Sequence, residues 1–160
     1  MNRFFSIAAL LCCLVWPSAT RAEEYANLSI DKLAVSSKTY AGQPLCYSRT
    51  DTPEVTALVL HIPPGGSTGW HKHPVPVYAY VLEGEMTVEM KDGSKYLFKK
   101  GEVIIEVMNI MHNGYNSGQE MTSLLVFYTG AEGVPNVIRK DAPAAPEAAT
   151  TPELSKSLRN

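Results

Sequence analysis

Three histidines carry the strongest chemical signal in this sequence. His71 and His73 form an i, i+2 pair, and His112 follows about forty residues later. Residues i and i+2 of a β-strand point to the same side, so the two imidazoles of the pair can be aimed at one point. Imidazole nitrogens are common ligands of zinc and other transition metals. The spacing therefore predicts a metal site that a chain folding back on itself would complete with the third histidine.

Each half of this site lies inside a motif. The first motif, residues 65–84, begins and ends with glycine and contains the pair as His71-Lys72-His73. The second motif, residues 101–116, begins with glycine, contains His112 and ends with Asn116. In residue types and in spacing they resemble the two characteristic motifs of the cupins, over about 50 residues. The resemblance implies an all-β, single-domain fold, a double-stranded β-helix or jelly-roll barrel, in which His71, His73 and His112 are the metal ligands.

The first motif departs from the family pattern at one informative position. Cupins usually have a glutamate ligand seven residues before the closing glycine, and here that residue is Val77. Tyr78 is one residue out of register and, by strand parity, faces the other way. We therefore expect three histidine ligands without this carboxylate. In the second motif, Val107 and Asn109 stand where the family often has proline and glycine, and asparagine can still adopt the positive φ of a turn.

A site of three neutral imidazoles would leave a divalent ion with its full charge of +2. Such a centre should favour anionic or chelating ligands and keep coordination positions open for them. Imidazole nitrogen suits transition metals better than magnesium or calcium, so we expect iron(II) or zinc, with manganese, nickel or copper as alternatives. Three-histidine cupins include dioxygenases that act on thiols and diketones, so the resemblance implies that oxygen chemistry is accessible.

The segments around the motifs have the pattern of short β-strands. Apolar residues alternate with period two, turn residues separate the segments, and no long helical period occurs, which favours a β-barrel or sandwich. Lys91-Asp92-Gly93-Ser94 predicts a hairpin with a two-residue turn. The predicted strands are residues 28–35 (a first strand or edge segment), 54–62, 77–82, 86–90, 96–98, 103–107 and 122–128.

The two ends of the chain differ from the part between them. Residues 1–22 have the basic, apolar and small-residue order of a secretory signal, so we expect cleavage after Ala22 and export to the periplasm or the medium. The apolar stretch of about 13 residues is too short to span a membrane, so no stable insertion is expected after cleavage. Residues 142–160 begin with a Pro- and Ala-rich segment and are predicted to be disordered. The cupin-like domain is then residues 23–141.

The net charge bears on which ligands the protein can bind, and the cysteine count bears on its disulfides. Cleavage would remove Arg3 and Arg21, leaving 14 − 2 = 12 basic against 16 acidic residues, a net charge of −4. This balance argues against nucleic acid and anionic membranes and leaves a small molecule as the expected ligand. Cys46 would be the single cysteine of the mature chain, so no internal disulfide can form. We expect its thiol to be buried rather than paired between chains.

Further residues are weaker candidates. His61 and Asn116 are interpreted as a barrel-end or surface residue and as a turn residue, in preference to roles beside the metal. An apolar pocket could draw on a subset of the barrel's large side chains, namely Trp70, Tyr80, Met108, Met111, Tyr115 and Phe127.

Three functional hypotheses remain open on the sequence alone. The first is a metal-dependent enzyme of the dioxygenase type. The second is a non-catalytic module that binds a small ligand or a metal, or a homodimer that uses the fold alone. The third is a protein whose histidines bind no metal.

Overall fold

The computed structural model describes residues 28–140. The predicted signal, residues 1–22, and the predicted tail, residues 142–160, lie outside the described residues. Residues 28–31 are grouped apart from the unit that begins at Lys32, and the fold below concerns residues 32–140. Over the described residues there is no helix long and apolar enough to cross a membrane.

The described chain is all-β. Nine strands follow one another without a helix between them, as the alternating sequence pattern predicts. In chain order they are β1 (Pro53–Ile62), β2 (His71–Lys72), β3 (Val77–Glu83), β4 (Glu85–Met90), β5 (Lys95–Lys99), β6 (Val103–Ile105), β7 (His112–Tyr115), β8 (Thr122–Ala131) and β9 (Ile138–Arg139).

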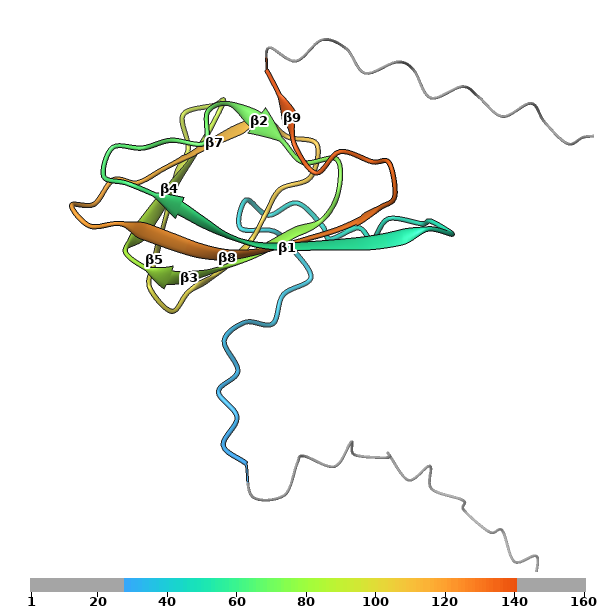
Figure 1. The fold of residues 1–160 in the computed structure, drawn as a ribbon, viewed down its shortest axis with the longest axis horizontal. Helices are drawn as coiled ribbons and strands as arrows, with labels where there is room; N and C mark the ends of the chain where they lie inside the picture. Colours follow the sequence, from blue (N-terminus) through green and yellow to red (C-terminus); the bar gives the residue numbers. More distant parts are fainter. Residues whose placement is uncertain (1–27, 141–160) are drawn as a thin grey trace, which may run out of the picture. The chain divides into compact units, whose positions relative to one another are not determined.

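The strands form two antiparallel sheets that face each other. One sheet has the order β1-β8-β3-β6 and the other the order β5-β4-β7-β2-β9, so strands far apart in sequence are neighbours. In Figure 1, β1, β8 and β3 lie along one side of the barrel and β7, β2 and β9 along the opposite side. Between the sheets lies an aliphatic core, in which Val81, Val88 and Ile104 are at most 1% exposed. This is the double-stranded β-helix predicted from the sequence.

The sequence predicts most of the long strands correctly. Residues 54–62 fall in β1, an edge strand paired only with β8, and most of its apolar side chains are exposed. The strands predicted at 77–82, 86–90, 96–98, 103–107 and 122–128 correspond to β3, β4, β5, β6 and β8. The short strands β2, β7 and β9 escaped separate prediction, because each has four residues or fewer and its partner is distant in sequence.

Three local predictions need correction. Residues 28–35 form no strand and are exposed, since they pair with no neighbouring strand. The β4–β5 hairpin forms, but four residues separate its strands, and Gly93 adopts a φ of +87° in the turn. Cys46 is exposed, not buried, because it lies in an irregular segment before β1 that contributes little to the core.

Two turns of the motifs require a left-handed backbone. Gly84 separates β3 from β4 at a φ of +70°, and a Cβ there would lie 2.6 Å from the carbonyl oxygen of Met121. Asn109 adopts a φ of +60°, which confirms that asparagine preserves the second-motif turn where the family often has glycine. The backbone amide of Asn109 donates to the carbonyl of His73 at 2.8 Å. This turn therefore helps to hold the first motif against the second.

Asn116 is a structural residue of this barrel. Its side chain is 2% exposed, and its amide nitrogen donates to the carbonyls of Ile62 and Glu120 at 2.9 and 2.7 Å. Its amide oxygen accepts from the backbone of Gly118 at 2.9 Å. One buried side chain thus ties the end of β1 to the loop before β8. The interpretation of Asn116 as a turn residue is correct, with this added tie to β1.

Replacing Asn116 with Ala should lower the free energy of unfolding by about 3 kcal/mol, because two buried carbonyls and one amide lose their partner. Urea denaturation of the purified protein measures this change. Gln119→Ala, at an exposed position of the same loop, is the matched control and should stay within about 0.5 kcal/mol of the wild type. Equal destabilisation by both substitutions would contradict this role of Asn116.

Candidate metal centre

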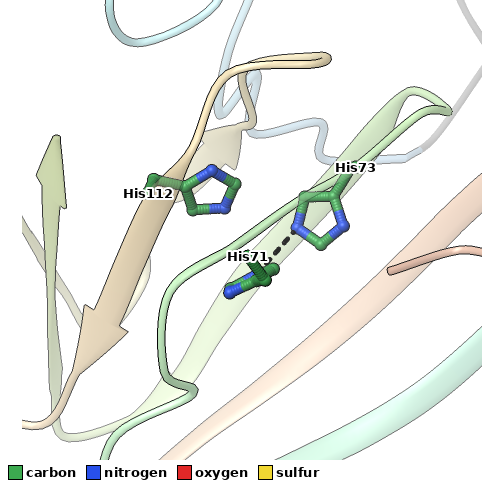
Figure 2. Close-up of side chains that lie close together, drawn as sticks. All are labelled: His71, His73 and His112. Atoms are coloured by element: carbon green, nitrogen blue, oxygen red, sulfur yellow. Dashed lines mark hydrogen bonds between the residues drawn. The ribbon is translucent and has the colours of Figure 1, made fainter. Parts of the chain in front are cut away.

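The fold brings the three predicted histidines together. His71 opens β2 and is paired directly with His112, which opens β7 in the same sheet. His73 lies two residues further on, where its backbone bridges to Met108 in the second motif. The three side chains are 6%, 3% and 1% exposed for His71, His73 and His112. Figure 2 shows their rings turned toward one another from the two segments of chain.

The distances within this cluster are short. Ring centroids lie 4.7 Å apart for His71 and His73, 4.4 Å for His71 and His112, and 5.0 Å for His73 and His112. One nitrogen from each ring can be chosen so that all three lie within 4.8 Å of one another. The Nε2 atoms of His71 and His73 are separated by 3.2 Å.

Backbone carbonyls fix the orientation of each imidazole. Nδ1 lies 2.7 Å from the carbonyl oxygen of Gly69 in His71, 2.8 Å from that of Asn136 in His73, and 2.9 Å from that of Ile110 in His112. A carbonyl oxygen can only accept a hydrogen bond, so each Nδ1 carries the proton in the neutral ring. Each Nε2 is then left with a lone pair, which is the arrangement that metal-binding histidines commonly show.

The three neutral imidazoles cannot hydrogen-bond to one another, but their nitrogens are spaced to bind a cation. Burial lowers the pKa of all three imidazoles, that of His73 to about 3, so the rings are neutral near pH 7. The Nε2 lone pairs of His71 and His73 then face each other at 3.2 Å without a proton to share. Two ligands about 2.1 Å from one metal ion lie about 3.0 to 3.4 Å apart at bond angles of about 90° to 110°. The observed spacing matches that range.

The structure also shows where Val77 lies, the first-motif position at which the family usually has a glutamate. Val77 is 3% exposed and belongs to the apolar core, while Tyr78 is half-buried on the other face of β3, as strand parity predicts.

Sequence reasoning missed Glu106, whose carboxylate lies 3.6 Å from Nε2 of His112. The signal was a charged residue two positions after the inward-facing Ile104, on the same face of an otherwise apolar segment.

A cavity of about 520 Å³ adjoins the cluster at His71. Tyr128 lies in its wall, Arg139 supplies a guanidinium, and Ser67 and Thr68 supply hydroxyls. None of the six large side chains proposed for the pocket lines this cavity; Phe127, for example, is 39% exposed on the outer face of β8. Strand parity alone could not identify the wall, because it depends on which residues the loops bring to the mouth of the barrel.

His61 is exposed, as expected for a barrel-end residue, and its Nδ1 lies 3.0 Å from the hydroxyl of Ser123. It lines the cavity, but it does not belong to the cluster formed by His71, His73 and His112.

Comparison with known proteins agrees with this geometry. The family model described as "Cupin domain" matches residues 58–128, a span that contains all three clustered histidines. This match supports the cupin superfamily for this chain. Curated proteins provide no match.

Several solved structures resemble this chain. A cupin domain from Bordetella pertussis is 23% identical over 48% of this chain and 82% of that chain, with a TM-score of 0.43. A predicted oxalate decarboxylase from Thermotoga maritima is 27% identical over 46% and 64%, with a TM-score of 0.42. The DMSP lyase DddQ from Ruegeria pomeroyi is 19% identical over 62% of this chain and 47% of its own length, with a TM-score of 0.48.

We expect all three clustered imidazoles to be the Nδ1–H tautomer in metal-free protein at pH 7.5, because each Nδ1 faces a carbonyl oxygen. Long-range ¹H–¹⁵N correlation spectra of protein labelled in its histidines distinguish the two tautomers directly. Single His→Gln variants assign the signals. An Nε2–H tautomer at any of the three rings would contradict the hydrogen-bonding scheme described above.

Proposed function

We propose that this chain is an exported, metal-binding cupin that acts on a small anionic or oxygen-rich molecule. In this proposal, His71, His73 and His112 hold one divalent transition metal ion, with iron(II) or zinc expected first and manganese, nickel or copper as alternatives. The observation that carries the proposal is the meeting of three buried histidines whose ring nitrogens lie within 4.8 Å of one another, each with its Nδ1 hydrogen-bonded to a backbone carbonyl. Residues 1–22, with the residue order of a secretory signal, support export.

The cavity beside His71 is the proposed substrate site. Its volume of about 520 Å³ is in the range of small-molecule pockets. Arg139 contributes a fixed positive charge to its wall, and a guanidinium can bind a carboxylate or another planar oxyanion through two parallel hydrogen bonds. The hydroxyls of Ser67 and Thr68 add polar contacts at the same mouth. This lining supports an anionic or oxygen-rich ligand.

Two activities are compatible with this site. A bound transition metal would supply Lewis acidity or, for a redox-active ion, oxygen activation, and the enzyme version is a metal-dependent dioxygenase. The chain's own residues would orient the ligand through Arg139 and restrict water through the apolar wall around Leu60 and Tyr128. The alternative is a non-catalytic module that captures a small ligand or the metal. The binding-module alternative is supported by Val77, which stands where cupins usually have a glutamate ligand.

Replacing His112 with Ala should abolish binding of one equivalent of metal, because the ring lost is 1% exposed and faces the other two imidazoles. Elemental analysis of the purified protein after loading and dialysis measures the stoichiometry. His61→Ala is the matched control and should retain one equivalent, since His61 lies outside the cluster. Full metal content in the His112 variant would remove the cluster from the proposal.

The enzyme and the binding module differ in oxygen uptake. We expect the iron(II)-loaded protein to consume oxygen with at least one member of a panel of thiols, diketones and phenolic acids, and the His112→Ala variant to consume none. An oxygen electrode records the rates, and calorimetry records binding of the same compounds. Tight binding without turnover, with each of the candidate metals loaded in turn, would favour the module over the dioxygenase.

A further inference from the structure

Glu106 occupies a particular place in the barrel. It follows β6 directly, and its backbone amide donates to the carbonyl of Val77 at 3.0 Å. The β3–β6 register pairs Tyr78 with Ile105, so one further step places Glu106 opposite Val77. Residues directly opposite on antiparallel strands have Cβ atoms about 5 Å apart and share a face of the sheet. Glu106 is therefore the cross-strand neighbour of the position where the first motif lacks its glutamate.

The Glu106 side chain reaches the edge of the histidine cluster at His112. It is 11% exposed, and its Oε2 lies 3.6 Å from Nε2 of His112. Oε2 of Glu106 and Nε2 of His112 are both buried side-chain polar atoms without a hydrogen-bond partner. Both atoms carry lone pairs, because Nδ1 of His112 already holds the ring proton against the carbonyl of Ile110. Two unpartnered acceptors facing each other indicate a binding site for a cation.

An ordinary ion pair does not explain this contact. A distance of 3.6 Å is too long for a hydrogen bond. No Lys or Arg in the described part of the chain forms an ion pair with Glu106. A buried carboxyl group with so little compensation is costly unless something binds it.

The spacing suits a shared metal ion. Two ligands about 2.1 Å from one ion lie about 3.4 to 3.6 Å apart at bond angles of about 110° to 120°. The separation of Oε2 and Nε2 falls at the upper end of that range, and the two Nε2 atoms of His71 and His73 fall within the corresponding range for smaller angles. Glu106 and His112 are thus spaced as two ligands of one ion would be, beside the cluster of three imidazoles.

We propose that Glu106 is the fourth protein ligand of this metal centre, so that the second motif supplies the carboxylate that the first motif lacks at Val77. This assignment rests on the proposed metal binding by the three histidines. It changes the donor set from three neutral imidazoles to three imidazoles and one carboxylate. The charge of the centre with a divalent ion falls from +2 to +1, and Arg139 becomes the second source of attraction for an anion.

Co²⁺ and Zn²⁺ binding to the purified full chain and its variants tests the assignment. Glu106→Gln keeps the shape of the side chain and should weaken Zn²⁺ binding by at least about tenfold in a chelator competition. It should also shift the visible absorption of bound Co²⁺, because an anionic carboxylate is replaced by a neutral amide. Glu132→Gln removes one exposed carboxylate elsewhere and is the matched control, with affinity and spectrum unchanged.

Transposing the carboxylate provides a sharper test. Val77→Glu combined with Glu106→Val moves the carboxylate to the opposite strand, and it should recover most of the affinity lost in Glu106→Val alone. Thermal melting without metal checks that each variant folds, and the metal-induced rise in Tm gives a second measure of binding.

Two outcomes would overturn the assignment. Wild-type affinity and Co²⁺ spectrum in Glu106→Gln, with binding abolished in His112→Ala, would reject Glu106 as a ligand while leaving the histidine site in place. Absence of Co²⁺ and Zn²⁺ binding by the wild-type chain would reject both the assignment and the proposed metal site.

Discussion

Mutual repulsion among buried lone pairs is the constraint on which this structure depends. The barrel places three imidazoles within a few ångströms of one another, and three backbone carbonyls force each Nε2 lone pair toward the common centre. Neutral rings in this tautomer have no proton with which to satisfy one another. Because each Nδ1 donates to a backbone carbonyl, each Nε2 is left as a hydrogen-bond acceptor with no donor in the cluster. This arrangement is costly by itself and becomes favourable when a cation occupies the centre.

The surrounding elements maintain this arrangement from several directions. The β2–β7 pair sets His71 opposite His112, and the turn at Asn109 holds the backbone of His73. Asn116 fixes the end of the second motif to β1 without touching the cluster. Short strands that would be unstable alone are thus held by contacts on both sides. The three histidines therefore lie on paired or bridged backbone, not on free loops.

Glu106 illustrates how a β-sheet can conserve a site while changing its sequence pattern. Residues paired across two antiparallel strands occupy nearly the same place relative to the core, so a carboxylate can enter the same space from either strand. Under the proposed assignment, Glu106 supplies the carboxylate that the family motif would place at position 77. The resulting centre is less electrophilic than one with three neutral ligands. Anion selection then depends more strongly on Arg139 in the cavity wall.

The sequence by itself determined the all-β fold, the main strands and the three histidines that meet. Those features are encoded locally, in the period-two alternation, the turn glycines and the motif spacing around His71 and His112. Tertiary structure decided the rest: the exposure of Cys46, the cavity wall at Tyr128 and Arg139, and the approach of Glu106 to His112. Each of these depends on strand register and on which loops meet at the barrel mouth. Residues such as Val77 and Glu106 lie far apart in sequence, and only their pairing across two strands makes them neighbours.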